Sequence, residues 1–193
     1  MRTVFFDVDT QLDFVSPAGA LYSSGAEGVI AAVERLNRHA ASQGIALIST
    51  VDAHAENDAE FAAWPPHCVA GSLGQHKAQA TLLDRSVVVP NRNGLPETDG
   101  AAQIVIEKQT VDVFETRTIA PLLARLAADR FVVYGVVTEV CVWNTARGLL
   151  RLGKPVTVVT DAIHALRAET GERALAALRA AGATLETVGD ALA

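Results

Sequence analysis

The sequence predicts an α/β fold in which a mostly parallel sheet is covered by helices on both faces. Two observations lead to this prediction. Short apolar runs alternate along the chain with longer amphipathic segments, and several of the apolar runs end in charged residues. Such alternation is typical of parallel strands joined by helices, because a parallel connection needs a long crossover. We therefore expect a three-layer, Rossmann-like sandwich with its sites at the carboxyl ends of the strands.

Seven apolar runs predict the strands of this sheet. They are rich in β-branched and aromatic residues and lie at residues 3–8, 45–51, 86–89, 104–107, 130–137, 155–160 and 184–188. Apolar residues recur with helical spacing in four other segments. These helices are expected at residues 26–43, 119–128, 139–152 and 169–181.

One domain is expected over residues 1–193. With 50% hydrophobic residues the chain can bury a large core, and it shows neither an interdomain linker nor an internal repeat. Residues 90–102, which contain NRNGLPETDG, are rich in turn formers and predict an exposed loop or hairpin. Its role as a lid or as an oligomer arm stays open.

Composition excludes several classes of partner. The net charge of -6 and the lack of a basic stripe argue against nucleic acid and anionic membranes. The N-terminus reaches acidic residues too soon for a signal peptide, and no apolar run approaches the roughly 20 residues of a membrane span. Two cysteines with local roles indicate a reducing cytoplasm.

Cys141 is the first candidate catalytic residue. It follows the apolar run FVVYGVV and a Thr-Glu turn, at the start of the helix expected over residues 139–152. Such a turn points side chains into the crevice at the strand ends, and the helix N-terminus favours a thiolate. The alternative is a buried structural cysteine, an interpretation that suits Cys68 better.

Charged residues end two further strands. The first strand runs into Asp7 and Asp9, which strand alternation puts on one face. A carboxylate here can act as a general base or cap the next turn. Lys108 follows another apolar run. It is either a solvent-exposed residue at the end of that strand or a buried neighbour of Asp9 and Cys141. In the second case it keeps the carboxylate ionised and adds positive charge near the thiol.

Asp52, His54 and His67 predict a metal site. Asp52 and His54 are two residues apart at the end of a strand, so their side chains project to one side. A loop stiffened by Pro65 and Pro66 is expected to bring His67 back to the same strand end. One carboxylate with two imidazoles suits Zn²⁺, Mn²⁺ or Fe²⁺, with open positions for water or substrate. Because Asp-x-His also arises by chance, these residues alone leave the metal open.

Four segments together resemble one enzyme family. DTQLDF, DAH followed by WPPHCV, the lysine of EKQTVDVF, and GVVTEVCV have the order and spacing of the isochorismatase-like cysteine hydrolases. The resemblance covers essentially the whole chain and is strongest to the nicotinamidase branch. It implies a triad of Asp9, Lys108 and Cys141. It also implies a cis peptide between Val136 and Val137, and an oxyanion hole formed by the N–H groups of Val137 and Cys141.

The resemblance also assigns the metal ligands. It implies that Asp52, His54 and His67 bind one divalent ion, zinc in the first place, with manganese or iron as alternatives. Glu60 lies where some family members contribute a fourth ligand or a water-mediated contact. The alternative for Glu60 is a solvated loop acid.

Substrate contacts are implied at Phe14, Trp64 and Val136. Phe14 and Trp64 occupy positions where nicotinamidases flank a pyridine ring, which suits a planar substrate. The alternative is ordinary loop packing. Val136 belongs with them as one residue of the expected cis peptide.

The chain departs from the family pattern at two places. Residues 111–113, Val-Asp-Val, replace the Tyr-Ser-Ala or Tyr-Ser-Gly that usually precedes the phenylalanine, here Phe114. This removes one pocket wall, and Asp112 adds an acid. Asp7 stands where the first strand is usually apolar. Its carboxylate is either capped by a backbone group or coupled to Asp9, which would raise the pKa of the pair.

These observations predict a metal-containing cysteine amidohydrolase. Its lead substrate is nicotinamide, hydrolysed to nicotinate and ammonia through a thioester, and we expect a cytoplasmic homo-oligomer that binds a small-molecule amide. The first alternative is a related hydrolase of another amide, a carbamoyl or ureido compound, or the vinyl ether of isochorismate. The second is a non-catalytic family member that binds a ligand.

Overall fold

The computed structural model describes residues 1–94 and 97–193, and these form a seven-stranded sheet in which every pairing is parallel. The strand order is β3-β4-β2-β1-β5-β6-β7. The predicted α/β fold is confirmed. The strands are β1 (Thr3–Val8), β2 (Ala46–Asp52), β3 (Ser86–Val89), β4 (Gln103–Lys108), β5 (Arg130–Val136), β6 (Val156–His164) and β7 (Thr184–Glu186).

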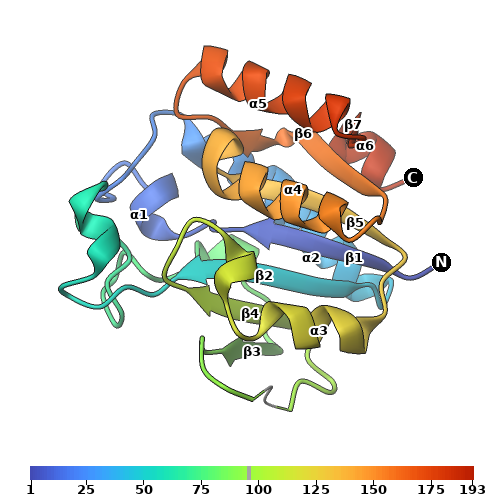
Figure 1. Cartoon of the computed structure of the whole chain (residues 1–193), viewed down its shortest axis with the longest axis horizontal. Helices are drawn as coiled ribbons and strands as arrows, with labels where there is room; N and C mark the ends of the chain where they lie inside the picture. Colours follow the sequence, from blue (N-terminus) through green and yellow to red (C-terminus); the bar gives the residue numbers. More distant parts are fainter. Residues whose placement is uncertain (95–96) are drawn as a thin grey trace.

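Helices cover both faces of the sheet (Figure 1). Successive side chains of β1 point to opposite faces of the sheet. Phe6 belongs to the core formed with α3, α4 and α5, whereas Phe5 belongs to the core formed with α2 and α6. In the described part of the chain, no helix has the length and apolar character needed to cross a membrane. The helices are α1 (Leu12–Val15), α2 (Ile30–Ser42), α3 (Ile119–Leu126), α4 (Trp143–Arg151), α5 (Ala168–Ala180) and α6 (Val188–Ala191).

The boundaries differ from the sequence prediction where local hydrogen bonds decide them. The strand expected over residues 184–188 ends at Glu186, because Thr187 and Asp190 form a capping box that begins α6. The helix expected over residues 139–152 begins with a π-helical turn, Thr138–Val142, before α4. That turn contains Cys141, so the candidate nucleophile lies in an irregular helix start.

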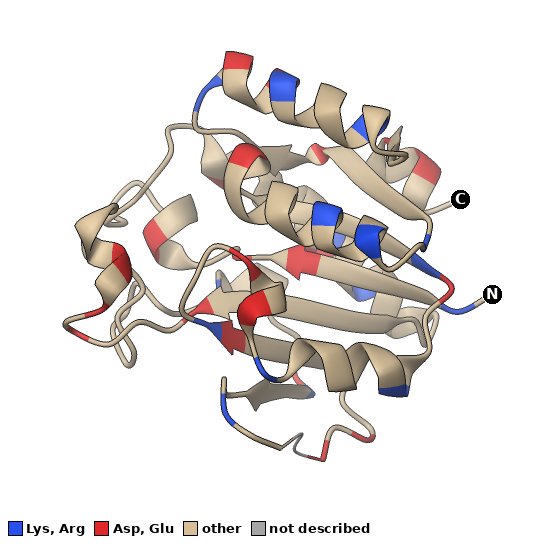
Figure 2. Cartoon of the chain, viewed as in Figure 1, with Lys and Arg blue, Asp and Glu red and all other residues tan. Residues whose placement is uncertain are grey.

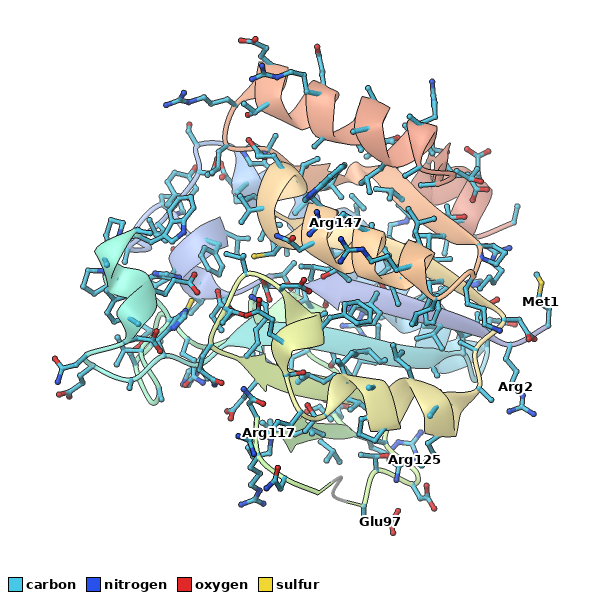
Figure 3. All side chains as sticks on the ribbon, viewed as in Figure 1. Met1, Arg2, Glu97, Arg117, Arg125 and Arg147 are labelled. Carbon is cyan, nitrogen blue, oxygen red and sulfur yellow. The ribbon has the colours of Figure 1, made fainter. Side chains whose placement is uncertain are left out.

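The loop at residues 90–102 connects β3 and β4. Residues 95–96 lie outside the described residues, and the described residues on either side of them form no strand, so they make no hairpin. Arg117 donates to Asn93 Oδ1 at 2.8 Å, and Arg125 of α3 bonds the same loop; both arginines are labelled in Figure 3. The described part of the loop is thus tied to the α3 side of the molecule.

The carboxyl ends of the central strands form one charged edge. Figure 2 shows acidic colour at the tip of β2, and basic and acidic colour together at the tip of β4. Both chain termini lie at the opposite edge (Figure 1). The fold therefore gathers the residues that end β1, β2, β4 and β5 into one place.

Candidate active site

Asp9, Lys108 and Cys141 come together at this edge. Asp9 follows β1, Lys108 ends β4 and Cys141 follows β5. The ammonium of Lys108 lies 2.9 Å from Asp9 Oδ2 and 3.7 Å from Cys141 Sγ. Asp9 and Lys108 are fully buried, and Cys141 is 7% exposed. The three side chains that the sequence singled out are thus neighbours in a site with little water.

Lys108 is shared between two carboxylates. It is in register with Asp52 on the neighbouring strand and bonds Asp52 Oδ1 as well as pairing with Asp9. Burial alone lowers the pKa of a lysine, but the negative charges of Asp52 and Asp9 outweigh it and raise the pKa of Lys108 well above its usual value. The two carboxylates therefore favour the charged form of Lys108.

Asp9 is set up as a proton acceptor of unusual basicity. Burial raises its pKa above the ordinary carboxyl value, and the opposing charge of Lys108 only partly offsets this. Thr50 donates a hydrogen bond of 2.6 Å to Asp9 Oδ1, which fixes the carboxylate in position. A carboxylate with a raised pKa accepts a proton more readily, as a general base requires.

The expectation that Asp7 and Asp9 share one face is wrong. Asp9 has φ +50, a left-handed conformation, so the alternation of β1 stops before it. Asp7 instead pairs with Lys77 at 2.9 Å and accepts from Asn37 of α2. Its four polar partners are all side chains, so no backbone group caps it.

The surroundings of Cys141 favour the protonated thiol. Burial raises the pKa of Cys141 well above its usual value, and the charges of Asp9 and Asp52 add to this, while Lys108 opposes it. The expectation that the helix start favours a thiolate is wrong for this site, because the thiol is buried in a π-helical turn beside two carboxylates. The site consequently needs a base to remove the thiol proton.

The backbone around Val137 has the geometry that the resemblance implied. The peptide between Val136 and Val137 is cis. The carbonyl of Val137 accepts from the N–H groups of Val140 and Val142 at 3.1 and 3.2 Å. Val137 and Cys141 line the same cavity. The oxyanion role of their N–H groups stays a prediction.

Asp52, His54 and His67 form a buried cluster suited to a metal ion. The Nε2 atoms of His54 and His67 lie 3.9 and 3.8 Å from Asp52 Oδ2, and one ligand atom from each residue falls within 4.8 Å of the others. His54 Nε2 is buried without a hydrogen-bond partner. Such an orphaned nitrogen, facing a carboxylate and a second imidazole, fits a divalent ion with nitrogen and oxygen ligands.

Each imidazole also has an oxygen atom close to its other ring nitrogen, although His54 Nδ1 makes no hydrogen bond. His67 Nδ1 lies 2.8 Å from the carbonyl of Pro65, and His54 Nδ1 lies 3.1 Å from Asp58 Oδ2. Contacts of this kind fix the tautomer and orientation of metal-binding histidines, leaving Nε2 for the ion. Asp58 was missed in the sequence, although its position four residues after His54 was an available signal.

Glu60 lies at the edge of this cluster. It is partly buried and lines the same cavity as Asp52 and His67. Burial, followed by the nearby negative charge of Asp52, raises the pKa of Glu60. Glu60 therefore lines the site, while its role as a ligand stays a prediction.

The cavity above the thiol is lined mainly by apolar side chains. The predicted contacts Phe14, Trp64 and Val136 all line it, as does Val111. The structure adds Val140, the neighbour of Cys141, and two residues from segments that the sequence did not connect to the site, Leu21 and Leu166. No lysine or arginine occurs among the described residues that line the cavity. The lining is thus largely apolar, with Asp52, Glu60 and His67 as its titratable side chains besides Cys141.

Two further residues organise the site from outside the cavity. Gln11 accepts from the N–H of Asp52 at 2.6 Å and donates to its carbonyl at 2.9 Å, which fixes the backbone at the end of β2. Asp112 does not add an acid to the pocket. Its carboxylate accepts from the N–H of Phe114 at 2.9 Å and caps a short turn.

The fold and the site together define an α/β enzyme with its candidate active site at the carboxyl ends of the strands, and the comparison with known families agrees. Residues 3–190 match the isochorismatase domain, so the chain belongs to the isochorismatase family.

Several of the proteins similar to this chain are named as nicotinamidases or pyrazinamidases. The nicotinamidase of Escherichia coli (strain K12) is 26% identical over 204 residues, which cover 95% of this chain and 93% of that protein. The zinc complex of the pyrazinamidase of Pyrococcus horikoshii is 27% identical, with a TM-score of 0.81 and coverage of 97% of this chain and 99% of the other. The pyrazinamidase/nicotinamidase of Streptococcus mutans is 25% identical, with a TM-score of 0.81 and coverage of 95% and 99%. These relatives support an amidohydrolase.

Proposed function

We propose that this protein hydrolyses a small, uncharged carboxamide to the acid and ammonia, with nicotinamide as lead substrate. The observation that carries the proposal is the buried cluster of Asp9, Lys108 and Cys141 at the base of an apolar cavity. The similarity to a nicotinamidase and two pyrazinamidases supports the choice of a planar heteroaromatic amide.

In the first half of the reaction, Asp9 takes the proton from Cys141 Sγ and the thiolate attacks the amide carbon. The N–H groups of Val137 and Cys141 stabilise the oxyanion that develops. Lys108 stabilises the negative charge that moves between thiol and carboxylate, since it lies within 3.7 Å of both. Asp9 then gives the proton to the leaving nitrogen, the C–N bond breaks, and ammonia departs from a thioester.

In the second half, Asp9 is again ionised and accepts a proton from water. The oxygen of that water attacks the thioester carbon, the C–S bond breaks, and the proton passes from Asp9 back to the sulfur. The acid product leaves and the thiol is restored. Asp9 thus alternates between base and acid, a role that its raised pKa suits.

A divalent ion is part of the proposal, held by Asp52, His54 and His67, with Glu60 as candidate fourth ligand. Zinc is the first choice, since the Pyrococcus horikoshii pyrazinamidase was solved with zinc. When bound, the ion supplies a Lewis acid with open coordination positions, for which the ring nitrogen of nicotinamide is a suitable donor. Phe14 and Trp64 would then bracket the ring.

The charge of the cavity separates the lead substrate from its rivals. Isochorismate and ureido acids carry carboxylates, which need a basic partner or lose hydration at a cost. Among the described residues that line the cavity, none is lysine or arginine; the basic side chain there is His67, which stands beside two acids, Asp52 and Glu60. An uncharged amide meets no such penalty.

The test is ammonia release from a panel of nicotinamide, pyrazinamide, aliphatic amides and ureido acids, with isochorismate cleavage measured in parallel, by protein of known metal content. We expect release from the uncharged amides, with nicotinamide or pyrazinamide preferred. Preference for a ureido acid or cleavage of isochorismate would overturn the substrate assignment. Silence toward every compound would favour the ligand-binding alternative.

Three broader features complete the proposal: one domain over residues 1–193, a homo-oligomeric state, and a reducing cytoplasmic location. Both cysteines are free and buried, as suits a reducing compartment. Light scattering coupled to size-exclusion chromatography measures the oligomeric state, and a monomer at micromolar concentration would contradict that part of the proposal.

A further inference from the structure

A second buried ion pair lies next to the site but outside the catalytic cluster. Asp7 in β1 is fully buried, Lys77 is 8% exposed, and the ammonium of Lys77 lies 2.9 Å from Asp7 Oδ2. Neither residue lines the cavity. Removing two charges from water is costly, so a pair kept here calls for a structural or functional reason.

The hydrogen bonds of Asp7 leave no room for a ligand. Its Oδ2 accepts from Lys77, from Asn37 at 2.8 Å and from Ser49 at 3.3 Å. Its Oδ1 accepts from the hydroxyl of Thr10 at 2.9 Å. Both oxygens are therefore used within the protein, and the pair serves to hold other groups.

Thr10 is hydrogen-bonded to both members of the pair. Lys77 donates to Thr10 Oγ1 at 2.7 Å, and the hydroxyl of Thr81 lies 3.0 Å from the same atom. The carbonyl of Thr10 accepts from the N–H of Ala78 at 2.8 Å. Both the side chain and the backbone of Thr10 are thus fixed to the segment that contains Lys77.

Thr10 directly follows Asp9, whose backbone is in the left-handed region with φ +50. This region disfavours residues other than glycine, so the surrounding structure must maintain it. A hydrogen bond of 2.7 Å from the N–H of Gln11 to the carbonyl of Asp9 closes the turn around Thr10. If β1 continued its alternation, the side chain of Asp9 would turn to the face of Asp7, away from Lys108 and Cys141.

We propose that Lys77 is a positioning residue for the reaction: together with Asp7 it anchors Thr10, and thereby keeps Asp9 in the left-handed turn that points its carboxylate at Lys108 and Cys141. This inference rests on the proposed role of Asp9 as general base. It assigns to a lysine that does not line the cavity an effect on the chemical step and not on binding.

The primary test is Lys77→Met, examined by kinetics and by crystallography. A small displacement of a catalytic group lowers the chemical rate, so we expect kcat to fall roughly 10- to 100-fold with KM unchanged. In the crystal structure of the variant, Asp9 Oδ2 should move from 2.9 Å to beyond ion-pair distance from Lys108. An unchanged kcat, or an unmoved Asp9 carboxylate, would overturn the inference.

Two further variants separate positioning from general stability. In Lys77→Met alone the buried carboxylate of Asp7 loses its countercharge, so the melting temperature should fall. In Asp7→Asn/Lys77→Met that charge is gone, and we expect the melting temperature to recover while kcat stays low, because Thr10 still lacks its bond to Lys77. Recovery of kcat together with stability would reduce the pair to a structural role and refute the inference. If the single variant does not fold, the double variant carries the same kinetic and crystallographic test.

Tyr134→Phe is the matched control. It deletes the buried hydroxyl that donates to Asn37 Oδ1 at 2.7 Å, at the end of the network remote from Thr10. We expect lower stability with unchanged kcat, and a loss of kcat equal to that of Lys77→Met would contradict the specific role of Lys77. If the wild-type protein releases no ammonia from any amide, the proposed function fails, whereas the position of Asp9 in the variant crystal still tests the anchor.

Discussion

Lys108→Met tests whether one buried cation holds the two carboxylates of the site together. At 2.9 Å and an effective dielectric constant of about 20, Coulomb's law gives about 6 kcal/mol of attraction between Lys108 and Asp9. The cost of burying the charges offsets part of this, and breaking a buried pair typically destabilises a protein by about 3–5 kcal/mol. The free energy of unfolding of small proteins is about 5–15 kcal/mol, so the variant should still fold but be much less stable.

The assay is urea unfolding of metal-free protein, followed by circular dichroism at several pH values. The free energy of unfolding falls by about 2 kcal/mol for each molar of urea, so this loss of stability should lower the urea concentration at the unfolding midpoint by roughly 2 M at neutral pH. Burial already raises the pKa of Asp9 in the folded state, and loss of Lys108 removes the largest opposing influence, so this pKa rises further. A raised folded-state pKa contributes stability below the unfolded value and loses it as pH rises through the folded value. The destabilisation should therefore shrink as pH is lowered toward the ordinary carboxyl pKa of 3.8.

The control is Lys154→Met, the same substitution at an exposed lysine, which should change stability by no more than about 0.5 kcal/mol. A loss below about 1 kcal/mol for Lys108→Met, the size expected of an exposed ion pair, would refute the account of the site. So would a destabilisation that grows as pH falls. In the enzyme assay, the same variant should lose roughly 100- to 10,000-fold in kcat/KM.

Three other predictions follow from single contacts. Thr50→Val removes a hydrogen bond that lowers the pKa of Asp9, so the acid limb of the kcat/KM profile should move to higher pH; an unmoved limb would exclude Asp9 as the titrating base. Asp58→Ala leaves His54 Nδ1 without its carboxylate and should weaken zinc binding roughly 10- to 100-fold by competition with a chelator, whereas unchanged affinity would refute its orienting role. Gly135→Ala should prevent folding or strongly lower the melting temperature, since φ is +116 and an added Cβ would meet the β1 backbone at 2.1 Å; wild-type stability would show that β5 can shift.

The sequence was sufficient to predict the sheet and the meeting of its strand ends. Asp9, Asp52, Lys108 and Cys141 follow four apolar runs, and the carboxyl ends of parallel strands share one edge. Their proximity therefore needs only the fold class. The metal cluster also depended on His67, which lies on a loop and was assigned by family resemblance.

Other features depended on contacts that no local pattern encodes. Lys77 pairs with Asp7 across 70 residues of sequence. The left-handed turn at Asp9 overrides the alternation of β1, so the face of its side chain could not be read from spacing. Leu21 and Leu166 reach the cavity from loops, whose positions follow from tertiary packing and not from periodicity.

The most direct measurement is ammonia release from nicotinamide or pyrazinamide by wild-type protein and by Cys141→Ala, with equal metal content and matching circular dichroism spectra. The account predicts turnover by the wild-type protein and none by the variant, because the thioester cannot form without Cys141 Sγ. Ammonia release by Cys141→Ala at the wild-type rate would contradict the central claim, since hydrolysis would then proceed without the thiol.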